Sequence, residues 1–135
     1  MIRADLHVHS RCSGKPANWL AKQFSIPESF TEPLHIYESA MKRGMTHVTI
    51  TDHNTIDGCL EIAHLPNTFI SCELTARFPE DGCRVHVLTH NITEDQFRDL
   101  VLVRKNIYTL VDYCYAHDIA HTIAHPLYSV NNMLT

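Results

Sequence analysis

The chain has 135 residues, which suits one domain, and 44% of them are hydrophobic, an ordinary share for a globular core. A formal net charge of -4 with 11 Lys and Arg argues against a nucleic-acid partner. No apolar run approaches the roughly 20 residues of a membrane span, and the N-terminus lacks the apolar core of a secretory signal, so we expect a cytoplasmic protein without a membrane partner.

Strands and helices are predicted to alternate along the chain. In chain order, we expect a strand at 2–8, a helix at 31–44, a strand at 47–51, a helix at 59–64, strands at 68–75 and 84–90, a helix from 93 to about 117 and a strand at 119–124. The turn residues 79–82 predict that the two strands flanking them pair antiparallel. The alternation predicts an α/β fold with a mostly parallel sheet or an incomplete barrel.

Two helices carry start signals. Pro33 stands early in its helix, where its missing N–H costs nothing, and Gln96 follows Thr93 at capping-box spacing. Apolar residues then keep a helical spacing from Thr93 to about His117, which predicts one long helix.

Histidine is the unusual residue type, with 11 in the chain. Because a neutral imidazole nitrogen binds metal ions, this excess favours a metal site. The five cysteines are scattered without a Cys-x-x-Cys pair, which argues against a disulfide framework and a cysteine zinc site. We interpret each thiol as a small buried hydrophobe.

Histidines and one glutamate fall at or near the ends of the predicted strands, where ligands collect in α/β folds. They are His7, His9, His53, Glu73, His86 and His125. His7 and His9 are two apart in an extended segment, so both rings can reach one ion at about 2.0–2.1 Å. An unpaired carboxylate would be costly in the apolar run around Glu73, which leaves a metal or a salt bridge to Arg77 or Arg84.

Other roles stay open. Asp52 either orients the His53 ring or binds a metal directly. His90 shares a strand face with His86, and it is either a ligand or an ordinary residue; His121 poses the same choice. Pro126 predicts an extended backbone at His125 that aims its ring. Structural roles are favoured for His35, His47, His64 and His117.

Together, the motifs DLHVHS, ITDHNTIDG, VHVL and IAHP and the strand carrying Glu73 resemble the PHP family, named for polymerase and histidinol phosphatase domains. The motifs occur along the whole chain in the family's order. The resemblance implies a distorted seven-stranded β/α barrel with two or three divalent metal ions in a cleft. It implies that the metal ligands are His7, His9, His53, Glu73, His86 and His125, with Glu73 bridging two metals.

The sequence departs from the family at two places. The family has an Asp or His ligand soon after the first motif, where this chain has Gly14, flanked by Ser13 and Lys15. The family also has a late Asp-x-His motif, which does not occur before Thr135. We therefore expect residues 1–135 to form a single PHP-like domain that lacks the C-terminal part of the barrel.

The implied activity is hydrolysis of a phosphate ester by metal-activated water, with Asp52, His53 and Glu73 as the candidate catalytic residues. Mixed imidazole and carboxylate ligands suit zinc, manganese or iron. The expected substrate is a phosphorylated small molecule or a nucleotide. The alternative is a non-catalytic, metal-binding PHP module of a larger enzyme or assembly. An incomplete barrel would expose a sheet edge, which favours pairing with a second copy.

Overall fold

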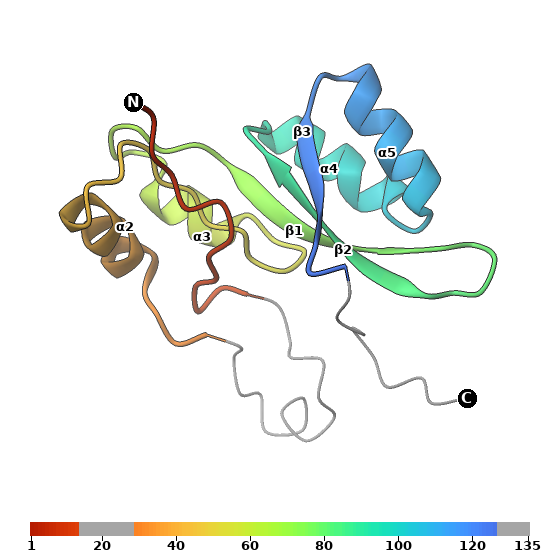
Figure 1. The fold of residues 1–135 in the computed structure, drawn as a ribbon, viewed down its shortest axis with the longest axis horizontal. Helices are drawn as coiled ribbons and strands as arrows, with labels where there is room; N and C mark the ends of the chain where they lie inside the picture. The colour runs from red at the N-terminus through yellow and green to blue at the C-terminus, as the bar shows by residue number, and fades with distance from the viewer. Residues whose placement is uncertain (14–28, 127–135) are drawn as a thin grey trace.

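The computed structural model describes residues 1–13 and 29–126 of the chain. Its helices and strands, in order, are α2 (Pro33–Lys42), α3 (Asp57–Ile62), β1 (Ser71–Arg77), β2 (Arg84–His90), α4 (Glu94–Val103), α5 (Ile107–Ala116) and β3 (Ala120–Ala124). Figure 1 shows α2, α3 and the N-terminal segment on one side of the molecule, and the sheet with α4 and α5 on the other. The mixed α/β class is confirmed.

The sheet has three strands in the order β1-β2-β3, and both pairings are antiparallel. The predicted hairpin of β1 and β2 is confirmed, with Glu73 opposite Leu88. The mostly parallel sheet was wrong for the described part of the chain, which also contains no closed barrel.

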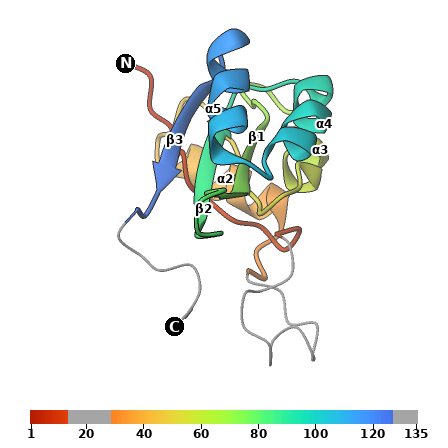
Figure 2. The same ribbon diagram turned by 90° about the vertical axis from the view of Figure 1, so that its right-hand side faces the viewer.

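The direction of β3 follows from the two helices that precede it. Predicted as one helix from 93 to about 117, this stretch instead forms α4 and α5, separated at residues 104–106. A helix pair returns the chain close to its starting point, so β3 begins with Ala120 opposite His90, at the end of β2 (Figure 2). One continuous helix would have carried the chain to the other end of the sheet.

Side-chain caps explain the division into two helices. Thr93 and Gln96 form the predicted capping box at the start of α4. Asn106 then caps α5, because its side chain accepts a hydrogen bond from Tyr108 N at 2.9 Å. The apolar spacing continues across the break, so periodicity alone did not reveal it.

In the described residues, parallel pairing is limited to isolated bridges and forms no ladder between two named strands. Isolated bridges join Val48 to Thr68 and His53 to Glu73. The strand predicted at 47–51 is therefore reduced to separate contacts.

The thiol of Cys59, on α3, occupies the gap between these two bridges. It donates a hydrogen bond to Ile50 O at 2.9 Å and accepts one from Ser71 N at 3.5 Å. Since the sulfur takes the position of a direct backbone contact, the two segments stay aligned without forming a continuous ladder.

The segment at 2–8, also predicted as a strand, has no regular secondary structure. It is nevertheless fixed, because Thr51 N donates to Val8 O at 2.7 Å and Val8 N donates to Thr51 Oγ1 at 2.9 Å. The threonine hydroxyl replaces a strand carbonyl in this contact, and the segment that carries His7 and His9 lies beside the segment that leads to His53.

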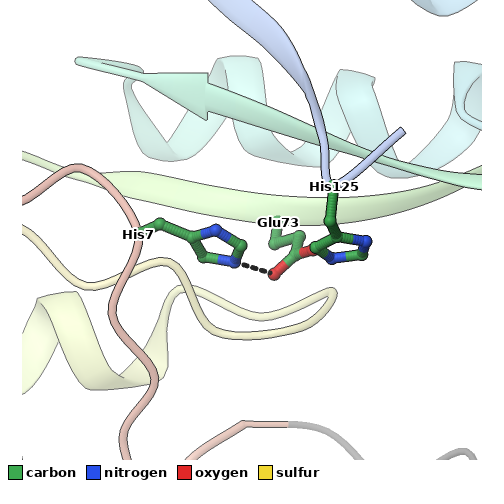
Figure 3. Close-up of side chains that lie close together, drawn as sticks. All are labelled: His7, Glu73 and His125. Carbon is green, nitrogen blue, oxygen red and sulfur yellow. Dashed lines mark hydrogen bonds and ion pairs between the residues drawn. The ribbon is translucent and has the colours of Figure 1, made fainter. Parts of the chain in front are cut away.

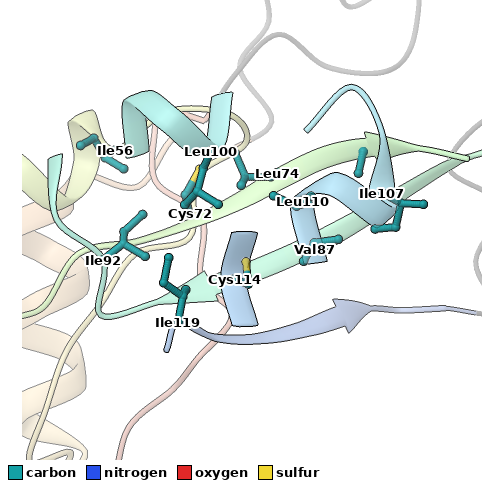
Figure 4. Packing of buried hydrophobic residues seen from close by; sticks show 11 residues of the cluster. Ile56, Cys72, Leu74, Val87, Ile92, Leu100, Ile107, Leu110, Cys114 and Ile119 are labelled. Atoms are coloured by element: carbon teal, nitrogen blue, oxygen red, sulfur yellow. The ribbon is translucent and has the colours of Figure 1, made fainter. Parts of the chain in front are cut away.

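Two hydrophobic clusters hold these parts together. One lies between the sheet and α4 and α5 (Figure 4), and it includes Cys72, Leu74, Val87, Leu100 and Leu110. The other joins α2 and α3 to the segment around Ile50. Because side chains alternate along a strand, Cys72 and Leu74 face the helices while Glu73 faces the opposite side.

The cysteines divide by burial. Cys59, Cys72 and Cys114 are buried, as predicted, whereas Cys12 is half-buried and Cys83 is exposed in the β1–β2 turn. Burial raises the pKa of each buried thiol, to about 11 for Cys114. Among the described helices, none has the length and apolar character needed to cross a membrane.

Candidate metal centre

Glu73 is the centre of a histidine cluster on the sheet face opposite α4 and α5. Its side chain is fully buried. One carboxylate oxygen, Oε2, lies 2.9 Å from His7 Nε2, 3.0 Å from His9 Nε2 and 3.7 Å from His53 Nδ1. Figure 3 shows His7 and His125 on either side of this carboxylate.

The second carboxylate oxygen, Oε1, faces two further rings. It lies 2.8 Å from His86 Nδ1 and 3.2 Å from His125 Nε2. The structure thus brings together all six residues that the sequence suggests as ligands, from the N-terminal segment, the loop after residue 51, all three strands and their ends.

Two sets of three ligand atoms are close enough to hold a cation, and Glu73 belongs to both. One set is His7, Glu73 and His125; the other is His9, His53 and Glu73; within each, the ligand atoms lie within 4.8 Å of one another. The rings of His9 and His53 stack at 4.7 Å, and those of His7 and His125 at 5.8 Å. Each set offers imidazole nitrogen and carboxylate oxygen, a combination that suits zinc, manganese or iron.

The electrostatics favour an ionised carboxylate. Burial alone would raise the pKa of Glu73, but the histidines, led by His86 and His9, hold the pKa of this carboxyl well below its usual range. A buried negative charge ringed by nitrogen donors attracts a positive ion. The alternative salt bridge to Arg77 or Arg84 does not occur, because every ion pair of Glu73 with the described residues involves a histidine.

His86 provides a direct test of whether a metal fits. Its Nδ1 is buried and only 2.8 Å from Glu73 Oε1, yet it makes no hydrogen bond of normal geometry with any described residue. A buried polar atom in this state needs a partner. A cation shared with Glu73 would supply one, so the donor set fits a divalent metal.

Asp52 does not join this cluster. Its buried carboxylate accepts hydrogen bonds from Ser10 N and Ser10 Oγ, each at 2.6 Å. Burial raises the pKa of Asp52, and the bonds from Ser10 oppose the rise. Asp52 lies outside both ligand sets, and its bonds to Ser10 fit the orienting role better than direct metal binding. Its catalytic role stays a prediction.

Two serines were missed in the candidate residues. Ser10 holds Asp52, and Ser13 Oγ lies 3.3 Å from His9 Nδ1 while accepting a hydrogen bond from His53 N at 3.1 Å. Their positions one and four residues after His9 in the sequence were the available signal, because groups near ligand histidines often orient them.

His125 reaches Glu73 with a backbone that differs from the prediction. Its φ is +31°, in the left-handed region, rather than extended as Pro126 suggested. β3 ends at Ala124, and the turn at His125 directs the ring toward Glu73.

The other histidines lie outside both ligand sets. His90 Nδ1 lies 3.1 Å from Ser71 Oγ, and burial lowers the pKa of its ring. His121 Nδ1 lies 2.8 Å from Ile119 O. Gly14 and Lys15 lie outside the described residues.

Comparison with known proteins gives partial matches. No family model matches the chain. A stretch of 68 residues, 50% of the chain, is 43% identical to an uncharacterised protein of Methanocaldococcus jannaschii, of which it covers 38%. The chain therefore spans well under half the length of this relative.

Two solved structures resemble the fold. An amidohydrolase from Chromobacterium violaceum, with sulfate bound and no metal, matches with a TM-score of 0.53 and 20% identity over 74% of this chain and 32% of its own. A Bifidobacterium adolescentis protein whose name classes it with metal-dependent phosphoesterases matches with a TM-score of 0.48 and 22% identity, over 73% of this chain and 32% of its own. At 20% identity, the likeness to the amidohydrolase concerns the fold alone.

Proposed function

We propose that this chain carries the metal-binding part of a metal-dependent phosphoesterase of the PHP kind, and that Glu73 is shared by two divalent cations. One observation carries the proposal: five histidine rings from distant parts of the chain surround both oxygens of one buried carboxylate. This arrangement crowds five imidazole rings around a single buried negative charge, which a fold would not favour without a cation.

The histidines would form two cation positions that share the Glu73 carboxylate. His9 and His53 would hold one cation with Oε2, and His7 and His125 would complete a second position that uses the same glutamate. His86 would join the position that includes His125, because its Nδ1 faces the same oxygen, Oε1. When bound, such cations polarise water and phosphoryl oxygens and stabilise the charge that develops during hydrolysis.

Burial differs across the cluster and suggests the side from which substrate arrives. The side chains of His7 and His125 are about a third exposed, at 35% and 36%, whereas those of His53 and His86 are 13% and 12% exposed. A phosphate group would therefore approach over His7 and His125, while His53, His86 and Glu73 exclude water from the back. The substrate class in this proposal is a phosphorylated small molecule or a nucleotide.

The experiment combines metal analysis with turnover. The purified protein is loaded with manganese or zinc, its bound metal is measured, and hydrolysis of a generic phosphomonoester is followed for the parent chain, His9→Ala and the control His64→Ala. The proposal predicts turnover that His9→Ala abolishes and His64→Ala preserves, because His64 lies outside both ligand sets. Full metal loading without turnover would instead support a non-catalytic metal-binding module.

A further inference from the structure

Hydrogen bonds between Ser10 and Asp52 link the segment that carries His9 to the segment that carries His53. Ser10 follows His9, Asp52 precedes His53, and both groups of Ser10 that can donate bind the Asp52 carboxylate at 2.6 Å. These bonds fix the two backbones beside each other. The rings of His9 and His53 then stack at 4.7 Å with an interplanar angle of 21°.

Ser13 provides a second link between His9 and His53. Its hydroxyl oxygen accepts the backbone N–H of His53 at 3.1 Å and lies 3.3 Å from the ring nitrogen Nδ1 of His9. The side chain is buried, with 6% of the residue exposed. One oxygen therefore contacts both histidines of the same ligand set.

The chemistry of imidazole indicates which atom donates in the hydrogen bond between His9 Nδ1 and Ser13 Oγ. His9 directs Nε2 toward Glu73 Oε2, at 3.0 Å. To bind a cation through Nε2, the neutral ring must carry its proton on Nδ1, and ligand histidines commonly donate that proton to an oxygen nearby. Ser13 Oγ is placed to accept it, since a hydroxyl oxygen has two lone pairs and His53 N–H uses one of them.

We propose that Ser13 is a positioning residue for the His9–His53–Glu73 set, and that it favours the His9 tautomer that carries its proton on Nδ1, so that Nε2 can bind a cation. The bonds between Ser10 and Asp52 hold the segments close enough for Ser13 to reach both histidines. This inference rests on the proposed metal site and deepens it. His7 and His125 enter the cluster from other segments, so loss of the Ser13 hydroxyl acts first on the set that contains His9.

The test compares Ser13→Ala with Ser13→Thr, which keeps the hydroxyl, and with the control Ser71→Ala. Ser71 is also a buried serine with a hydroxyl near a histidine nitrogen, but its histidine, His90, lies outside both ligand sets. Zinc affinity is measured by competition with a chromogenic chelator. Nitrogen NMR of histidine-labelled, zinc-loaded protein reports which ring nitrogen of His9 carries the proton.

In the parent chain, His9 is expected to carry its proton on Nδ1 when zinc is bound. Ser13→Ala is expected to weaken zinc binding at one position by roughly 10–100-fold, the range for groups that orient ligand histidines. Ser13→Thr should restore most of this affinity, and Ser71→Ala should leave it unchanged. An Nδ1 of His9 without a proton in the zinc-loaded parent chain, or equal zinc affinity in Ser13→Ala, would overturn the proposal.

A metal-free measurement separates this inference from the proposed function. Ser13→Ala should increase hydrogen exchange at the His53 amide, whose partner it removes, in protein without metal. Faster exchange together with no zinc binding by the parent chain would overturn both the metal site and the role of Ser13 in it, while the serine contact itself would stand. Zinc binding by the parent chain with unchanged affinity in Ser13→Ala would overturn the inference about Ser13 alone.

Discussion

A Cβ atom added to Gly58 would lie 2.3 Å from Asp52 Oδ2, closer than any real Cβ contact. The same atom would lie 2.6 Å from Ser10 Oγ. The first turn of α3 therefore needs glycine at this point, because the carboxylate that links the segments of His9 and His53 fills the space.

Gly58→Ala is expected to destabilise the fold by about 1–3 kcal/mol, the usual cost of overpacking, and to weaken metal binding. The loss arises because Asp52 must move away from Ser10. Denaturant unfolding of the metal-free protein measures the first effect and chelator competition the second. Gly82→Ala is the comparison: its φ is +73° but nothing lies within 4 Å of the added atom, so it should lower stability without changing metal affinity. Equal metal affinity in Gly58→Ala would contradict the link from α3 to the site.

Glu73→Gln should reduce affinity for divalent cations by more than roughly 100-fold, beyond the range for residues that only orient ligands. The amide keeps the shape of the side chain but removes the charge shared by both ligand sets. Isothermal titration with zinc or manganese measures the change. Glu61→Gln is a suitable control, because Glu61 is exposed and pairs with Arg11. Metal binding by the Glu73→Gln variant as tight as that of the parent chain would rule out the shared carboxylate.

Metal removal should lower the melting temperature. A cation that binds only the folded chain stabilises it by about 2.7 kcal/mol at 100 times its dissociation constant. Unfolding followed by circular dichroism, with a chelator and then with zinc restored, gives the shift. No difference between the two conditions would mean that the histidine cluster holds no cation in the folded protein.

The cysteines should react in the order of their burial. Cys83 is exposed and should be alkylated by iodoacetamide within minutes at neutral pH, whereas Cys59, Cys72 and Cys114 should resist until the chain unfolds. Burial raises the pKa of these three thiols, which lowers the fraction present as the reactive thiolate and adds to their steric protection. Mass spectrometry after timed labelling identifies the modified residues. Early labelling of Cys59 would show that its position between the two parallel segments is open.

Asn106→Ala should cost about 0.5–2 kcal/mol of stability, because the side chain caps the start of α5. Lys105→Ala, one residue earlier, removes no cap and serves as the reference. Urea unfolding of the two variants compares them, and equal midpoints would mean that the cap does not determine where α5 begins.

The sequence anticipated the hairpin around residues 79–82, the capping box at Thr93 and the residues that gather at Glu73, because turn chemistry, caps and the histidine motifs are local signals. It did not anticipate the break between α4 and α5, since the apolar spacing runs across Asn106 without a change of period. That break also determines the antiparallel direction of β3, so one local error altered the predicted topology.

At the site, the sequence motifs did not reveal the contacts that some candidate residues make. The motifs indicate which histidines are candidates, but nothing in them shows that Asp52 turns toward Ser10 rather than toward a cation. That outcome depends on the space left by Gly58, which is a tertiary contact. The positive φ of His125 likewise depends on the end of β3 and on the position of Glu73. The general preference of a residue before proline for an extended backbone takes neither of these contacts into account.

The most direct test of the account is the position of bound metal in crystals soaked with zinc, located from anomalous scattering at the zinc absorption edge. We expect a peak within about 2.0–2.2 Å of a Glu73 oxygen and of nitrogens from the surrounding histidines. Strong peaks elsewhere, such as at the exposed His35 or His64, with none beside Glu73 would contradict it.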